Sequence, residues 1–204
     1  MPIIERKIIM KYSIDGDFSP VLTVFINKNE LLSAKAGSDG WHSPHICEIN
    51  SADNIIDALK SGLSEDRLFS RKYTSYADDA EITLIPDASP CTIYPAEVSE
   101  SSPLLFTHSA FLAASGGAKL TPYISKTFGE KRFELCEAVG SGTVFLQLCG
   151  NVIKRDLGED EELIVRSEQL AACSKSCRTE IYRENSDIML KISNGSILLS
   201  TARN

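Results

Sequence analysis

The residues with the clearest chemical potential are two histidines and a cysteine that follow the chain's only tryptophan. His42, His45 and Cys47 lie within six residues of one another, and imidazole and thiolate groups are ligands for transition metals. Their spacing differs from that of a zinc finger, and no fourth ligand follows nearby. Cys173 and Cys177 could complete such a site only if a distant part of the chain came close. We therefore expect no metal and interpret the two histidines as solvated loop residues.

Nucleophilic catalysis would need a hydroxyl or thiol within hydrogen-bond reach of a base. His108 and Ser109 are neighbours in a segment that we predict to be a strand, where adjacent side chains point to opposite faces. They would then not pair as base and nucleophile, and the sequence contains no G-x-S-x-G motif. The triplet Gly140-Ser141-Gly142 is too short for a phosphate-binding loop, and we interpret it as a hairpin turn. We expect no catalytic, cofactor-binding or metal-binding residues.

The charge of the chain bears on its partners. The net charge is −7 and the calculated pI about 5.1, and an acidic surface repels the phosphate backbone of nucleic acids. A small basic patch could form only if repeated units stacked, and we interpret its members as a solvated face. These members are Arg71, Lys72, Lys131 and Arg132. Nucleic acid is therefore not an expected partner.

The elements that would position these residues are centred on residues 103–150. This region indicates two hairpins, the first turning at Gly116 and Gly117 and the second at residues 140–142. In the outgoing strand Val144 and Leu146 share one face, because side chains alternate along a strand. The region therefore predicts a unit of two hairpins.

A shortened copy of this unit follows it in the chain. At an offset of 58 residues Ser109 falls on Ser167, and residues 112–114 fall on residues 170–172. Residues 188–199 repeat the second hairpin around an Asn-Gly pair, which is the strongest short hairpin signal in the chain. Because an internal repeat dictates the architecture, we predict an all-β protein with internal hairpin repeats.

A looser copy precedes the central unit. Residues 21–37 echo the first hairpin and residues 68–86 the second. Between them the hydrophobic period becomes helical after Ser51, a plausible N-cap, which predicts one short helix near residues 54–61.

The chain divides most naturally where prolines and serines gather, between residues 87 and 102, because proline cannot donate to a strand ladder. We predict an N-terminal β unit over residues 1–98, which contains the helix. A C-terminal β unit over residues 99–204 would contain two further hairpin repeats.

The location of the protein follows from what the sequence lacks. It has no apolar run of 18 residues and hence no transmembrane helix. Residues 1–13 carry charges and lack the continuous apolar core of a signal peptide. We therefore expect a cytoplasmic protein, with its six cysteines reduced rather than paired in disulfides.

Several short segments resemble the mitochondrial biogenesis family named for altered inheritance of mitochondria protein 24. They are residues 10–14, 20–24, 58–60, 66–69, 111–115 and, most closely, 140–147. The resemblance implies a β fold likened to the trp RNA-binding attenuation protein (TRAP), with the unit duplicated, and it supplies no catalytic residues. The chain departs from the mitochondrial members in lacking a transit peptide, in its cysteine count and in a non-glycine turn at Asp78-Asp79. We therefore do not extend their role in inner-membrane organisation to it.

The predicted fold class is thus all-β, with duplicated TRAP-like units of the β-sandwich or double-stranded β-helix type. The function that we expect is that of a non-enzymatic scaffold or assembly protein. Unpaired strand edges favour self-association into a homo-oligomer, and another protein partner is possible. The alternatives are a binding module for RNA or a small ligand and, ranked third, a metal-dependent enzyme that uses the region of His42, His45 and Cys47.

Overall fold

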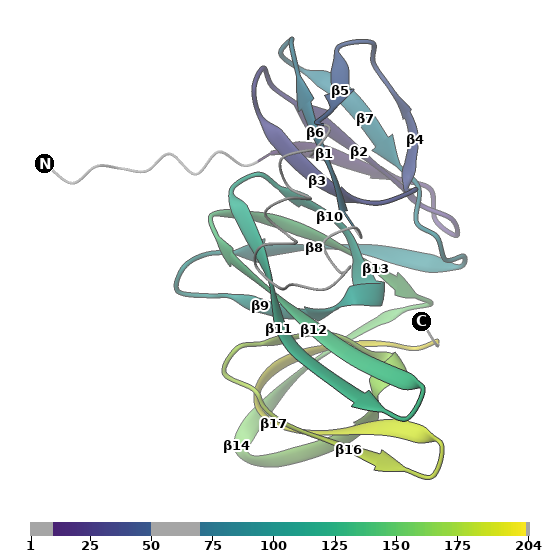
Figure 1. The fold of residues 1–204 in the computed structure, drawn as a ribbon, viewed down its shortest axis with the longest axis vertical. Coiled ribbons are helices and arrows are strands. Elements are labelled where there is room, and N and C mark those ends of the chain that lie inside the picture. The colour runs from purple at the N-terminus through teal and green to yellow at the C-terminus, as the bar shows by residue number, and fades with distance from the viewer. Residues whose placement is uncertain (1–9, 50–69, 203–204) are drawn as a thin grey trace, which may run out of the picture.

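The computed structural model describes residues 10–49 and 70–202 of the chain, and strands make up most of this part (Figure 1). The predicted all-β fold class is confirmed. Within the described residues two 3-10 turns, η2 (His108–Ala110) and η3 (Ser167–Gln169), complete the element order. The helix predicted near residues 54–61 lies outside the described residues.

The strands form three stacked sheets, and the four-stranded sheet is one end layer (Figure 1). Its order is β1 (Lys11–Asp15), β2 (Val21–Ile26), β7 (Ala80–Leu84) and β4 (Asp39–His42). β1 and β2 form a hairpin across a turn at Gly16, whose φ of +100° suits glycine. In β2, Leu22, Val24 and Ile26 are buried and face the next sheet, as the period-two alternation predicts.

The six-stranded sheet is the middle layer. Its order is β5 (Ile46–Glu48), β6 (Ser70–Ser75), β3 (Leu31–Lys35), β10 (Phe111–Ser115), β13 (Gly142–Cys149) and β8 (Cys91–Val98). Phe145 packs toward the four-stranded sheet, whereas Val144 and Leu146 pack toward the other end layer. Because both faces are covered, β13 is buried along almost its whole length, and each fully buried Leu or Phe contributes about 1.5–3 kcal/mol.

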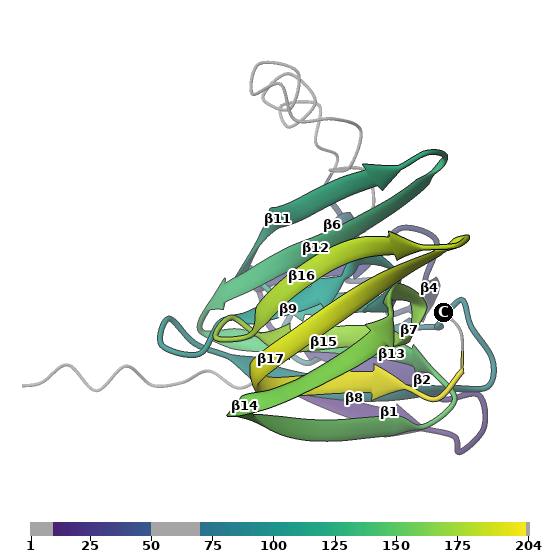
Figure 2. The same ribbon diagram turned by 90° about the horizontal axis from the view of Figure 1, so that it is seen from below.

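The seven-stranded sheet forms the other end layer and curls around a core of its own (Figure 2). Its order is β11 (Ala118–Phe128), β12 (Lys131–Gly140), β9 (Leu104–Thr107), β15 (Leu170–Ser174), β17 (Asp187–Ser200) and β14 (Val152–Arg166), and β16 (Arg178–Glu184) also pairs with β17. Leu135, Leu190 and Ile197 are among the buried side chains inside the curl.

The strands on either side of the second glycine turn of the central unit lie where the sequence predicted them, but their predicted pairing is wrong. β12 and β13 flank the triplet 140–142, yet β12 pairs with β11 and β9 whereas β13 pairs with β8 and β10. The glycines therefore make a corner between two sheets rather than a hairpin turn. The same holds upstream, where β2 and β3 belong to different sheets, as do β6 and β7.

The Asn-Gly pair in the last strand is a second correction. Asn194 and Gly195 adopt φ values of +59° and +100°, but they lie inside the continuous strand β17. At this point the ladder with β14 shifts register between Leu157 and Glu162. The positive φ values therefore serve a bulge, which bends the strand, and not a turn.

One element does recur in the structure, with a slightly different offset. η2 leads directly into β10, and η3 leads directly into β15. The strands start at Phe111 and Leu170, so the offset is 59 residues rather than the 58 of the sequence superposition.

Both strands end in a serine that performs the same task. The Ser115 hydroxyl accepts a hydrogen bond from the Thr143 N–H (2.9 Å), and the Ser174 hydroxyl accepts one from the Ser196 N–H (3.1 Å). Each serine thereby holds the neighbouring strand, β13 or β17, at the residue that follows a glycine (Gly142 or Gly195).

Candidate functional site

The His-x-x-His-x-Cys segment spans the connection between two sheets. His42 ends β4 in the four-stranded sheet, His45 lies in the following turn, and Cys47 lies on β5 in the six-stranded sheet. The Nδ1 atom of His42 lies 2.9 Å from the carbonyl oxygen of Ser43, and Cys47 interacts with the side chain of Tyr76. Cys173 and Cys177 belong to the other end layer, at or just after β15. Across residues 10–49 and 70–202 no three His, Cys, Asp or Glu side chains are grouped as metal ligands would be.

His108 and Ser109 lie on the turn η2 and not on a strand, so the strand argument that separated them was wrong. The Ser109 hydroxyl lies 3.4 Å from that of Thr107. Its carbonyl oxygen accepts a hydrogen bond from Gln147. These contacts make Ser109 part of a structural network.

The four basic residues that could have formed a patch are divided between β6 and β12, in different sheets. Arg71 contacts the carboxylates of Asp39 and Glu48, and Arg132 pairs with Glu134. Lys131 lies 3.9 Å from Asp187. Acidic neighbours thus offset much of this positive charge.

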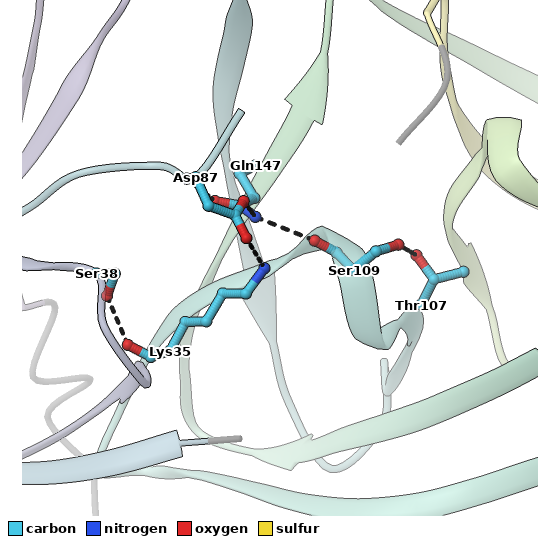
Figure 3. A network of polar contacts seen from close by, with 6 residues as sticks. All are labelled: Lys35, Ser38, Asp87, Thr107, Ser109 and Gln147. Carbon is cyan, nitrogen blue, oxygen red and sulfur yellow. Dashed lines mark hydrogen bonds and ion pairs between the residues drawn. The ribbon is translucent and has the colours of Figure 1, made fainter. Parts of the chain in front are cut away.

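A polar cluster that was not predicted from the sequence lies beside the middle sheet (Figure 3). It joins Lys35 at the end of β3, Asp87 in the β7–β8 connection and Gln147 in β13. The Lys35 ammonium donates to the Asp87 carboxylate at 2.6 Å. Gln147 donates to Asp87 and to the carbonyl oxygen of Ser109 (3.1 Å), and it accepts from the Asp87 N–H (3.2 Å). Three separate parts of the chain are thereby tied to the middle sheet.

The electrostatics of this cluster favour a structural role. Burial alone would raise the pKa of the Asp87 carboxyl, but the hydrogen bonds and charge of Lys35 and the bond from Gln147 outweigh it and lower that pKa. Gln147 is only 3% exposed, and both ends of its amide are engaged. An ionised carboxylate held by an ammonium group is poorly suited to proton transfer near neutral pH.

The outer face of the four-stranded sheet exposes large apolar side chains. Thr23, Thr83 and Trp41 lie side by side across β2, β7 and β4, and the two threonine hydroxyls are 2.9 Å apart. Ile85, just beyond β7, is 44% exposed, and Trp41 is 55% exposed. The Lys11 ammonium lies 4.5 Å from the centre of the Phe25 ring.

We call the residues Val21, Thr23, Phe25, Trp41, Thr83 and Ile85 the outer patch. None of them is charged, and they occupy adjacent positions on or next to neighbouring strands, although Thr83 is itself buried (1% exposed). The exposed charges of Lys11 and Glu81 lie on either side of Phe25. The opposite, inner face of the same strands packs on the middle sheet. Aromatic side chains such as Trp41 and Phe25 are enriched at the centres of protein interfaces. The outer patch is therefore the candidate functional site.

A polar depression on the seven-stranded sheet is a weaker candidate. Its lining consists of Glu162, Arg178, Thr179, Glu180, Lys191 and Ser193. Lys191 pairs with Glu162 across it at 2.8 Å. Ligand pockets are usually lined mainly by apolar groups, so this depression does not resemble a small-molecule site.

None of the described residues forms a helix with the length and hydrophobicity needed to cross a membrane.

Comparison with known proteins identifies relatives by sequence and by fold. The family described as Mitochondrial biogenesis AIM24 matches residues 12–202. A protein from Streptococcus pyogenes, known from its X-ray crystal structure, superimposes with a TM-score of 0.80. The match covers 95% of this chain and 94% of that chain at 20% identity, so it shows likeness of fold alone. No curated protein sequence matches the chain.

Proposed function

Because the chain belongs to the mitochondrial biogenesis AIM24 family, we propose, on the strength of its outer patch, that it is a non-enzymatic scaffold that assembles with copies of itself. The family name states a process and no reaction. The proposal places the protein in the cytoplasm.

The carrying observation is the exposure of Trp41 and Ile85 on a sheet face that they share with the uncharged Val21, Thr23 and Phe25. Charged residues, Lys11, Asp15 and Glu81, lie at the margin of this group. Covering such a face removes apolar area from water, which stabilises a complex by about 25 cal/mol for each Å² buried. A second copy of the chain offers the same patch, so a two-fold contact would bring patch against patch.

The charged groups of the described residues support protein partners over nucleic acid. The net charge is −7, and Arg71, Lys131 and Arg132 lie beside carboxylates. Tight binding to phosphates would need several basic groups that are free to replace counterions.

The test is the molar mass in solution, measured by light scattering after gel filtration. We expect a mass that is a multiple of the 22.4 kDa protomer. Trp41→Glu and Ile85→Lys each place a charge in the patch and should return the protein to the protomer mass. Both positions are exposed, so the melting temperature should change little.

Ile164→Lys is the matched control, because Ile164 is 57% exposed on β14 in the other end layer. It should leave the assembly intact. A wild-type protein at the protomer mass at all concentrations would refute self-assembly. Dissociation by Ile164→Lys but not by the patch variants would place the contact elsewhere.

A further inference from the structure

Two cysteines beside the curled sheet form a thiol pair that the proposed scaffold role does not use. Cys173 lies on β15 and is almost completely buried, and Cys177 lies in the turn before β16 and is half-buried. The turn is closed by a hydrogen bond from the Cys177 N–H to the Ser174 carbonyl (3.1 Å). It directs the Cys177 side chain onto the core cluster that contains Cys173, and the two thiols influence each other's ionisation.

The surroundings hold the Cys177 sulfur in place. The Ser174 hydroxyl lies 3.4 Å from it, and it lies 3.5 Å from the carbonyl oxygen of Ser196. On its remaining side is Gly195, where an added Cβ would lie 3.0 Å from the sulfur. The glycine at the β17 bulge therefore leaves the space that the thiol occupies.

From this geometry we infer that Cys173 and Cys177 form a redox-active dithiol that reacts with low-molecular-weight disulfides. Cys177 is the attacking thiol, because it is the more accessible of the two. Cys173, buried in the core cluster on which Cys177 packs, is the resolving thiol.

The reaction balances with the disulfide as the only oxidant. The Cys177 thiolate attacks one sulfur of the disulfide, forms a mixed disulfide and releases one thiolate, which takes up the proton that Cys177 gave up. Cys173 then attacks the Cys177 sulfur, and the second thiolate leaves with the Cys173 proton. The protein loses two hydrogen atoms and forms one disulfide, while the small disulfide is reduced to two thiols.

The ionisation of the pair agrees with these roles. The hydrogen bond from Cys173 lowers the pKa of the Cys177 thiol to about 6, with a further contribution from Ser174, although burial opposes the shift. The same hydrogen bond, together with burial, raises the pKa of Cys173. Cys177 can therefore give up the proton that it shares with the Ser196 carbonyl near neutral pH, and the thiolate is the form that attacks disulfides.

A second pair of cysteines serves as the internal control. Cys91 and Cys149 face each other across β8 and β13, so they too are neighbours on a sheet. Burial raises the pKa of both thiols, which keeps them protonated at neutral pH. Proximity alone would make both pairs reactive, whereas the inference predicts reaction only at Cys173 and Cys177.

The first test is peptide mapping by mass spectrometry after the native full chain is incubated with glutathione disulfide at pH 7. We expect a disulfide between Cys173 and Cys177 and unmodified Cys91 and Cys149. Cys173→Ala should trap glutathione on Cys177, because the resolving thiol is gone, and Cys177→Ala should leave Cys173 unmodified. The double variant Cys91→Ser, Cys149→Ser should still form the Cys173–Cys177 disulfide.

The second test is the pH dependence of Cys177 alkylation by iodoacetamide, which follows the thiolate. The rate should level off above a midpoint near the Cys177 pKa of about 6, and Cys173→Ala should raise that midpoint. Failure of the native protein to form the disulfide would overturn the inference. So would glutathione that is spread evenly over all cysteines, or a midpoint that Cys173→Ala leaves unchanged.

Discussion

At the scale of single residues, the side chain of Gln147 joins three segments of the fold. Its amide sits in a strand that is buried on both faces, and it meets Asp87 and Ser109 from two other segments. A buried amide that lost these partners would cost about 1–3 kcal/mol. The cluster therefore fixes where the β7–β8 connection and η2 lie on the middle sheet.

The ion pair in this cluster predicts a pH-dependent contribution to stability. Asp87→Asn removes the charge that Lys35 contacts, and we expect a loss of about 0.5–1 kcal/mol at pH 7, because the carboxylate is more than half exposed and is screened by solvent. The folded-state pKa of Asp87 is lowered, so its contribution is present above the unfolded pKa of about 4. It is lost as the pH falls through the lower folded value.

Urea unfolding of wild type and Asp87→Asn at pH 7 and at about pH 3 would measure this. The gap in the free energy of unfolding should shrink at the lower pH. Asp17→Asn, at an exposed aspartate in the β1–β2 turn, should change little at either pH. A gap that is constant with pH would mean that the charge of the Asp87 carboxylate does not contribute to stability.

At the scale of elements, two glycine corners explain how strands of different sheets come to lie on one another. One is the triplet 140–142 between β12 and β13, and the other is residues 116–117 between β10 and β11. The Ser141 N–H donates to the Gly117 carbonyl at 3.1 Å, so one corner rests on the other. A Cβ on Gly117 would lie 2.0 Å from the Ser141 carbonyl oxygen, and one on Gly140 would lie 2.4 Å from that of Gly117. The atom that each added Cβ would meet is a backbone oxygen, which cannot rotate away as a side chain can.

Gly117→Ala should accordingly destabilise the protein by about 3 kcal/mol, near the upper end of what overpacking costs. Gly158→Ala is the matched control, because nothing lies within 4 Å of its added Cβ, and we expect a change within about 0.5 kcal/mol. Thermal or urea unfolding would measure both. Equal effects would contradict the close approach of the two corners.

The sequence predicted the positions of these strands but not their partners, for a physical reason. A glycine with positive φ can form a hairpin turn, a corner between sheets or a bulge. The flanking strands show the same period-two alternation of apolar and polar residues in each case. The long hairpin of β11 and β12 was missed because β11 is mostly polar and exposed. Its Pro122 suits an edge strand with a bulge.

The candidate site was harder to predict than the strands. Trp41 and Ile85 are separated along the chain, and only the register of β4 and β7 shows that they share an outer face. Gln147 did carry a signal, since it is a polar residue in the apolar run of residues 144–148. Cys173 and Cys177 were noted only as distant metal ligands, because their influence on each other depends on the turn between them.

At the scale of the whole molecule, the middle sheet joins the two predicted units. It contains β3, β5, β6 and β8 from residues 1–98 and β10 and β13 from residues 99–204. β3 pairs directly with β10, with Ala34 opposite Ala113. The cores on its two faces share this sheet, because Phe145 lies in one of them and Leu146 in the other. Loss of either core would therefore expose part of the other.

This sharing predicts that the full chain unfolds in one cooperative transition. Ile82→Ala empties a site in the core between the four-stranded and middle sheets, and Leu190→Ala empties one inside the curl of the seven-stranded sheet. Each should lower the free energy of unfolding by about 2–5 kcal/mol and move the entire transition. In differential scanning calorimetry the calorimetric and van't Hoff enthalpies should agree for the wild type and for both variants. Two separate transitions, each moved by only one of the variants, would contradict this prediction. They would show that the units on either side of residue 98 fold independently, without coupling through the pairing of β3 with β10.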